Sequence, residues 1–243
     1  MEPSAMIYAV AGLLAAGVIK GATGIGYSSC ALPFLVAAVG LKPAVALLVV
    51  PAMASNLMVV CTAGHLRATV QKFWPLYIAT LPGIIAGIFA LTALDQHVAT
   101  KLLGGLIVAY GLQSLLHPSF QLGSAVARGL RIPVGLVSGF FTGLTGSQVM
   151  PLMPYMLSLN MNSEQLVQAV NIAVITASVF LGVCLMTFGV VQPELLMLSL
   201  LAVVPALLGV QAGTWYRSRI DDRRFRGLVV LVLMAIGAAL VVR

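Results

Sequence analysis

The chain has 243 residues, of which 60% are hydrophobic and only 8% are charged, and its mean hydropathy is +1.08. Soluble domains carry about a quarter charged residues, so the composition excludes an ordinary soluble protein. The net charge of +7 does not indicate a nucleic-acid-binding protein, because five arginines fall within residues 217–226, between two apolar runs, where positive charge marks the cytoplasmic side of a membrane.

The first half of the chain begins with two short apolar segments within residues 5–39, joined by a glycine-rich stretch at residues 20–33. Each segment is short for a complete crossing, which predicts a broken or re-entrant helical hairpin. A polar loop with Arg67 and Lys72 is expected between the first two of the membrane helices that follow. These helices are predicted at 43–63, 73–94 and 99–116.

The second half repeats this plan after a polar linker at residues 118–131. A second glycine-rich hairpin is expected at 132–159, and Asn162 with Gln165 predicts the start of the next helix. Further membrane helices are predicted at 164–187, 194–215 and 226–242. The chain is therefore expected to be an all-α polytopic membrane protein, one integrated domain with repeats at 1–117 and 132–243.

The two halves share matched motifs. Each glycine-rich stretch runs from a glycine to a proline over the same distance, at 21–33 and at 139–151. Each half also has a proline followed by two glycines spaced Gly-xxx-Gly, a pattern typical of closely packed membrane helices. The glycines of this second motif are Gly83 and Gly87 in the first half, and Gly209 and Gly213 in the second.

The number of crossings predicts that the two repeats have opposite orientations in the membrane. Each repeat has a hairpin, whose ends lie on one side, and three complete crossings, and three is an odd number. If loops 64–73, 117–131 and 216–226 are cytoplasmic, nine of the thirteen basic residues lie inside, as the positive-inside rule requires. We therefore expect a multi-pass protein of the bacterial cytoplasmic membrane.

Inverted repeats with interrupted helices are typical of secondary transporters, which bind their substrate at the repeat interface near the middle of the membrane. Broken helices expose backbone N–H groups, glycine lets the backbone approach a ligand closely, and hydroxyl and amide side chains add polar contacts. This combination favours a small anion. The expected substrate-binding residues are Lys20, Gly21, Thr23, Gly24, Ser28, Ser29, Asn56, Thr142, Thr145, Gly146, Ser147, Gln148 and Asn171.

Lys20 is the most informative of these candidates. A cation inside a bilayer is costly, and no Asp or Glu is predicted deep within a span, so an anionic substrate is its natural partner. The alternative is that Lys20 extends to the lipid headgroups from the end of a short helix. Asn56 and Asn171 also have two interpretations, as residues lining the pathway or as interhelical hydrogen-bonding groups.

The sequence does not favour an enzyme. It has no H-E-x-x-H or G-x-S-x-G motif and no P-loop, and its glycines do not match a dinucleotide fingerprint. The three cysteines and three histidines have no metal-ligand spacing. No catalytic residue, metal or cofactor is expected.

With its two glycine-rich segments that end in proline, the chain resembles the sulfite exporter TauE/SafE family, also described as the 4-toluene sulfonate uptake permease family. The family usually has a run of glycines before that proline, whereas this chain has Tyr27, Ser28 and Ser29 in one copy and Ser147 and Gln148 in the other.

The resemblance implies transport of a small sulfur-containing anion such as sulfite, thiosulfate or an organosulfonate like sulfoacetate. Export by alternating access is expected, with the anion held between the two hairpins. Two alternatives remain open: an ion-coupled uptake carrier or channel for another small anion, and a membrane scaffold without transport. Membrane lipids are expected partners and nucleic acid is not, and whether the chain forms a homo-oligomer stays open.

Overall fold

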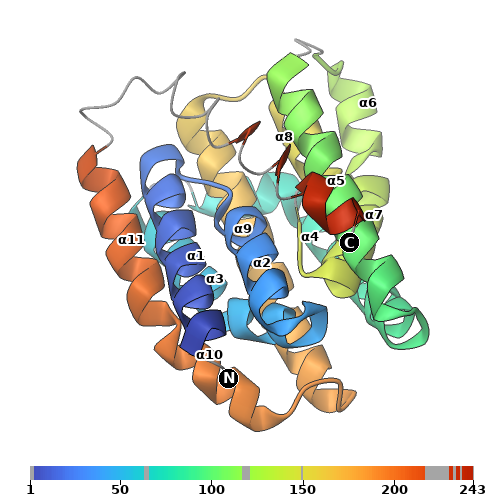
Figure 1. Cartoon of the computed structure of the whole chain (residues 1–243). Coiled ribbons are helices and arrows are strands. Elements are labelled where there is room, and N and C mark those ends of the chain that lie inside the picture. The colour runs from blue at the N-terminus through green and yellow to red at the C-terminus, as the bar shows by residue number, and fades with distance from the viewer. Residues whose placement is uncertain are drawn as a thin grey trace.

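The computed structural model describes residues 3–62, 66–116, 121–148 and 150–216, together with 230–231, 234–235 and 237–242. Within these ranges the regular elements are all helices, labelled α1 to α11 in Figure 1. The prediction of an all-α chain is therefore confirmed for the described residues. Seven of the seventeen residues of the predicted span at 226–242, and parts of the loops at 64–73, 117–131 and 216–226, lie outside them.

The helices of the first half begin and end close to the predicted positions, with two corrections. The first apolar segment is not short for a crossing, because Met6–Thr23 of α1 is long and apolar enough to span a membrane. The loop expected to carry Arg67 and Lys72 is instead the first part of α4, because residues 66–72 contain no glycine or proline to stop a helix. With 28 residues, α4 is about 42 Å long and exceeds a hydrocarbon core of about 30 Å. The first-half helices are α1 (Pro3–Thr23), α2 (Tyr27–Val39), α3 (Leu41–Thr62), α4 (Leu66–Ala93) and α5 (Gln96–Leu116).

The second half differs from the prediction in two places. The linker at 118–131 contains a short helix, and the span predicted at 194–215 is two helices that meet at Ala202. Pro205 has no N–H to bond the carbonyl of residue 201, which favours a break upstream of it. The predicted cap is confirmed, because the Asn162 side chain accepts a hydrogen bond from the Gln165 N–H at 2.8 Å. The helices are α6 (Ser124–Gly129), α7 (Arg131–Thr145), α8 (Leu152–Leu157), α9 (Ser163–Thr187), α10 (Pro193–Leu201) and α11 (Val203–Tyr216).

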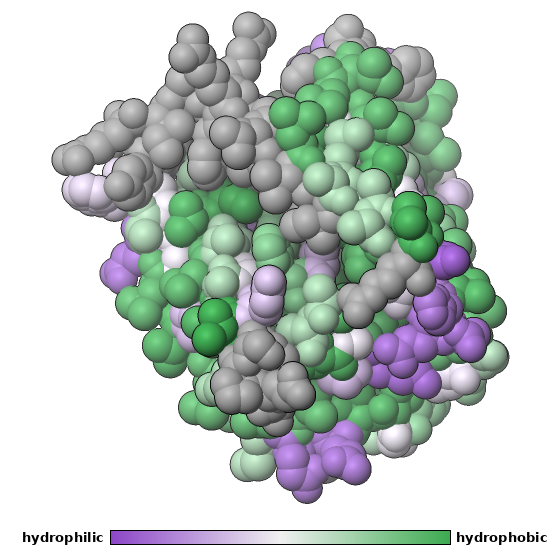
Figure 2. Space-filling view, viewed as in Figure 1, coloured by the Kyte–Doolittle hydropathy of each residue, from purple (hydrophilic) through white to green (hydrophobic). Residues whose placement is uncertain are grey.

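Six segments of the described chain are long and apolar enough to cross a membrane. Large apolar side chains also face outward, such as Phe89, which is 57% exposed, and Leu201, which is 70% exposed. Figure 2 shows apolar residues covering much of the visible face. Such a surface suits lipid, and the protein is a multi-pass membrane protein. The six segments are Met6–Thr23, Leu41–Cys61, Leu66–Ala93, Gln96–Leu116, Ser163–Thr187 and Met197–Trp215.

Two helix pairs, α4 with α7 and α1 with α11, pack most extensively. Glycines make this approach possible, because a Cβ added at Gly83 would overlap the backbone of α7 and one added at Gly209 would overlap that of α1. Gly87 and Gly213 lie one turn further along the same interfaces. The close packing predicted for both Gly-xxx-Gly motifs is confirmed.

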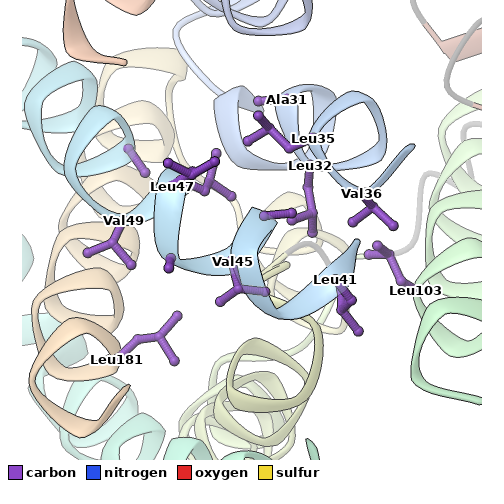
Figure 3. Close-up of a cluster of buried hydrophobic side chains, with 14 of the residues drawn as sticks. Ala31, Leu32, Leu35, Val36, Leu41, Val45, Leu47, Val49, Leu103 and Leu181 are labelled. Carbon is purple, nitrogen blue, oxygen red and sulfur yellow. The ribbon is translucent and has the colours of Figure 1, made fainter. Parts of the chain in front are cut away.

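The main apolar core lies where α2, α3, α5 and α9 meet. Figure 3 shows Leu32 and Leu35 of α2 near Leu41 and Val45 of α3, with Leu181 approaching from α9. The four leucines are at most 4% exposed, so the packing holds α2 firmly against the long helices. This packing positions the N-terminal end of α2, which carries much of the candidate site.

Candidate functional site

Each glycine-rich stretch contains a break between two helices. In the first stretch, α1 ends at Thr23 and α2 starts at Tyr27, with Gly24 at φ 79° and Gly26 at φ 88° between them. In the second, α7 ends at Thr145, and Gly146 follows at φ 75°. Glycine adopts positive φ without the steric cost that a Cβ imposes, which explains why the helices stop at these positions.

Each break lies against a long helix of the opposite half. The Gly24 position faces Val167 of α9, whose Cγ1 would lie 3.2 Å from an added Cβ. The Gly146 position faces Val45 of α3, whose Cγ2 would lie 2.9 Å away. The two breaks and the helices α3 and α9 therefore enclose a shared central region.

Lys20 lies in the last turn of α1 and is 1% exposed. Its Nζ donates hydrogen bonds to Asn56 Oδ1 on α3 at 2.5 Å and to Asn171 Oδ1 on α9 at 2.8 Å. The structure thus brings together three residues that the sequence offered separately. It also contradicts the alternative in which Lys20 extends to the headgroups.

The two amides are held with their oxygens toward Lys20. Asn171 Nδ2 donates to the carbonyls of Gly24, at 3.0 Å, and Val167, at 2.7 Å. Asn56 Nδ2 donates to the Ala52 carbonyl. Both amides also join helices, so the two interpretations of Asn56 and Asn171 are compatible.

The positive charge of Lys20 is not neutralised by these contacts. Amide oxygens accept its hydrogen bonds but carry no net charge, and no carboxylate of the described residues pairs with it. A buried cation without an ionic partner is costly unless an anion approaches it. When protonated, Lys20 therefore carries a charge that no described side chain balances.

Two small cavities lie beside this cluster. One, of about 30 Å³, is lined by the start of α2 from Gly26 to Ser29 and by Asn56. The other, of about 10 Å³, is lined by Thr142, Gly146 and Ser178 among others. Ser28 and Gln148 line both cavities, whereas Lys20 lies behind Asn56 and lines neither. Both are of the size of single water molecules, so this conformation is closed to a larger ligand.

The start of α2 supplies backbone donors to the larger cavity. The first bond within this helix runs from the Cys30 N–H to the Gly26 carbonyl, so the N–H groups of residues 27–29 precede it. Gly26 has no side chain to cap them. Free N–H groups at a helix N-terminus favour an anion.

Several buried polar atoms near the cavities have no protein hydrogen-bond partner. They are the Tyr27 hydroxyl, the Ser147 hydroxyl and Gln148 Oε1. Buried polar atoms are normally satisfied, so these are available to a polar ligand or to water. Tyr27, which is 1% exposed, is absent from the residues expected from the sequence. The feature of the sequence that could have identified Tyr27 is its position directly after Gly26, at the start of α2.

Three of the expected hydroxyls are engaged by their own helices. The hydroxyls of Thr23, Thr142 and Thr145 donate to the carbonyls four residues earlier, at 2.9, 2.7 and 2.7 Å. A hydroxyl that has donated its one hydrogen offers only lone pairs to a ligand. In this conformation they are poorly suited to hold an anion directly.

The remaining expected residues separate into two groups. Ser29 is buried and lines the larger cavity with Ser28. Gly21 lies on the face of α1 that packs on α11, where an added Cβ would overlap the Val210 carbonyl oxygen.

In the described part of the chain, no three His, Cys, Asp or Glu side chains gather as a metal site requires.

Comparison with known proteins gives one match, to a family model. No curated protein and no solved structure matches the chain. The family model described as sulfite exporter TauE/SafE matches residues 8–240, nearly the whole chain. The same residues include both helix breaks, Lys20 and its two amide partners. The chain therefore belongs to the sulfite exporter TauE/SafE family of membrane transporters.

Proposed function

We propose that this protein is a secondary transporter that exports a small sulfur-containing anion, such as sulfite, thiosulfate or an organosulfonate. The observation that carries the proposal is the buried Lys20 ammonium, held by two amide oxygens and unneutralised by any described carboxylate. The anion binds between the two helix breaks. The N–H groups at the start of α2 contact it, and Lys20 attracts it from behind Asn56.

A symmetric relation between the two halves supports an inverted repeat. Gly24 contacts the Val167 position and Gly146 contacts the Val45 position. The two glycines are as far apart in sequence as the two valines, 122 residues in each case. The helix pairs α1–α11 and α4–α7 correspond in the same way. Such exchanged contacts are expected of two related halves packed around a pseudo-twofold axis.

The symmetry also identifies what is unique to the first half. The spacing of 122 residues from these contacts differs from the 118 residues between the glycine-to-proline stretches. At the spacing of 122, Thr142 corresponds to Lys20, Ser178 to Asn56, and Val49 to Asn171. These three residues line the smaller cavity. The scaffold is thus repeated but the cation is present once, which suits one anion held off the symmetry axis.

The closed cavities support alternating access. A sulfur oxyanion is larger than a water molecule, so the site must open toward one side and then toward the other. The breaks at Gly24–Gly26 and Gly146 are the natural points of movement, because α2 and α8 can tilt there without unwinding the long helices.

The membrane potential gives export its direction. In a cell that is negative inside, moving one negative charge outward releases about 2.3 kcal/mol per 100 mV. Export therefore proceeds without a coupled ion. Uptake would require one.

Release of anions from loaded proteoliposomes tests this proposal. Vesicles loaded with sulfite, thiosulfate or sulfoacetate should release one of these anions faster than empty-membrane controls, and an imposed potential should change the rate in the direction that a moving negative charge requires. Replacing Na⁺ by K⁺ or choline, or collapsing a pH gradient, should leave the rate unchanged. Loss of flux on ion replacement would favour the ion-coupled carrier, and absence of flux for all the anions would contradict transport of this class.

A further inference from the structure

A basic cavity lies away from Lys20, between the start of α4, the α6–α7 segment and the end of α8. Its volume is about 420 Å³. Three cationic side chains line it: Lys72, Arg128 and Arg131. Gln121, Ser124 and Asn160 add neutral polar groups, and no Asp or Glu is among the described residues that line it.

Two of the cations lie near the same aromatic ring. Lys72 Nζ lies 5.3 Å from the centroid of the Phe73 ring, and Arg131 Cζ lies 5.6 Å from the same centroid. The two charges are therefore separated by no more than the sum of these distances. An anion that contacts both side chains would offset their mutual repulsion.

Arg131 also retains an unused donor. Its Nε is buried and has no hydrogen-bond partner, although the guanidinium lies beside the Tyr155 hydroxyl. A guanidinium presents several N–H groups in a plane that matches the oxygens of an oxyanion. The guanidinium also lies over the Phe73 ring, a cation–π contact that favours its present position.

The walls of the cavity are connected to α8. The Tyr155 hydroxyl donates to the Ala127 carbonyl of α6 at 2.7 Å, and the Leu122 N–H donates to the Ser158 carbonyl at 3.0 Å. Met153, in the same short helix, lines the larger central cavity. A ligand in the basic cavity therefore contacts the element that separates it from the central site.

We infer that this basic cavity is a second anion site, specific for an oxyanion of sulfur or phosphorus, which binds Lys72, Arg128 and Arg131. The shared chemistry is a compact group with several anionic oxygens. Its source is either the free anion before it reaches the central site or the phosphate of an anionic lipid headgroup. The site is separate from Lys20 in space and in its residues, although its role as a loading site rests on the proposed function.

Binding to purified full-length protein tests the inference without requiring transport. In a Lys20→Ala background, the central site is disabled, and titration with sulfite, thiosulfate and inorganic phosphate reports the remaining site. We expect saturable binding of at least one of these ions, with one ion per chain. Adding Arg128→Gln and Arg131→Gln should weaken it at least about tenfold, the loss expected when charge-assisted hydrogen bonds are removed.

Two further variants control for folding and for general charge. Lys72→Gln alters an exposed side chain and should weaken binding without changing the elution volume on gel filtration. Lys101→Gln removes an equal charge from the exposed start of α5 and should leave binding unchanged. Equal binding by Lys72→Gln, by the double arginine variant and by the Lys20→Ala parent would overturn the inference.

Lipid nanodiscs distinguish the two sources. If the free anion is the ligand, sulfite or thiosulfate binds equally in phosphatidylcholine and phosphatidylglycerol discs. If a headgroup is the ligand, phosphatidylglycerol displaces the small ion, and its own retention falls in the double arginine variant. Either result supports an oxyanion site, whereas no binding of the ions or the lipid excludes it. Failure of the proposed transport would be seen separately, as absent flux in a protein that still binds oxyanions at this cavity.

Discussion

Lys20 is held by neutral amide oxygens, which accept its hydrogen bonds without cancelling its positive charge. Asn56 and Asn171 accept its hydrogen bonds, and both use their amide nitrogens on backbone carbonyls. Each side chain is at most 2% exposed. A carboxylate in either position would form an ion pair with Lys20 and compete with an anionic substrate, so the amides keep the charge available.

Asn171 is expected to be important for both stability and transport. Asn171→Ala removes an acceptor of Lys20 and the donor to the Gly24 carbonyl, and should destabilise the protein by about 1–3 kcal/mol because buried polar groups lose their partners. Thermal unfolding in detergent and anion flux measure the two effects.

Thr176→Val is the matched control on the same helix, since the Thr176 hydroxyl bonds only the Ile172 carbonyl of its own helix. It should change both quantities little. Equal effects from the two variants would show that Asn171 has no special role at the helix break.

The sequence identified Lys20, Asn56 and Asn171 as separate candidates, but it did not predict that they bond one another. The contacts join residues 36 and 151 positions apart, and no local pattern encodes them. Tyr27 was missed because a tyrosine in an apolar run is usually a packing residue. The threonine hydroxyls were expected to face a ligand, and their bonds to their own helices compete with that role.

At the scale of helices, the packing of α4 on α7 depends on residues without side chains. An added Cβ at Gly139 would overlap the Thr80 carbonyl oxygen. Gly139→Ala should therefore force the helices apart and cost about 1–3 kcal/mol, as overpacking of a close interface usually does. Thermal unfolding in detergent measures the change.

Gly105→Ala provides the comparison on α5, where an added Cβ meets no atom of the described residues within 4 Å. It should be neutral or stabilise the helix by up to about 1 kcal/mol through propensity. If both alanine variants unfold at the wild-type temperature, close glycine packing does not stabilise this fold.

The second helix break makes a separate prediction. Gly146→Ala introduces a Cβ at φ 75° and pushes it against Val45, so it should displace α3 from the break and reduce transport. Gly189→Ala carries the same conformational cost at φ 62°, but its Cβ meets none of the atoms that the structure describes within 4 Å. We expect an anion flux close to wild type from Gly189→Ala and a strongly reduced flux from Gly146→Ala. Comparable fluxes would contradict a functional contact between the break and α3.

Most helix positions follow from the sequence because apolar runs of membrane length are long and unambiguous. Boundaries are less predictable where polar residues continue a helix beyond the lipid, as at Arg67 and Lys72 in α4. The break at Ala202 was missed because the run at 194–215 is largely apolar, and Pro205 is the nearest signal of an interruption.

For the molecule as a whole, the orientation in the membrane can be tested with single cysteines. In a Cys61→Ser background, Gln192→Cys should react with an impermeant maleimide added to intact cells, since the loop at 188–194 has no basic residue and is expected outside. Ser124→Cys should react only after permeabilisation. Both positions are exposed, and the other two cysteines, Cys30 and Cys184, are buried. The reverse pattern would invert the topology, and labelling of both from outside would contradict the parity of the crossings.

The central claim is that the uncompensated charge of Lys20 creates the anion site, and anion binding to wild type and Lys20→Ala tests it most directly. Thermal unfolding should be measured across sulfite, thiosulfate, sulfoacetate, taurine and sulfate, with Lys101→Ala as the surface control. All three proteins should also carry Arg128→Gln and Arg131→Gln, so that binding at the basic cavity does not contribute. We predict that at least one sulfur-containing anion raises the unfolding temperature of wild type and of Lys101→Ala, and that the rise is much smaller in Lys20→Ala. An equal rise in all three proteins would show that the anion binds elsewhere and would contradict the claim.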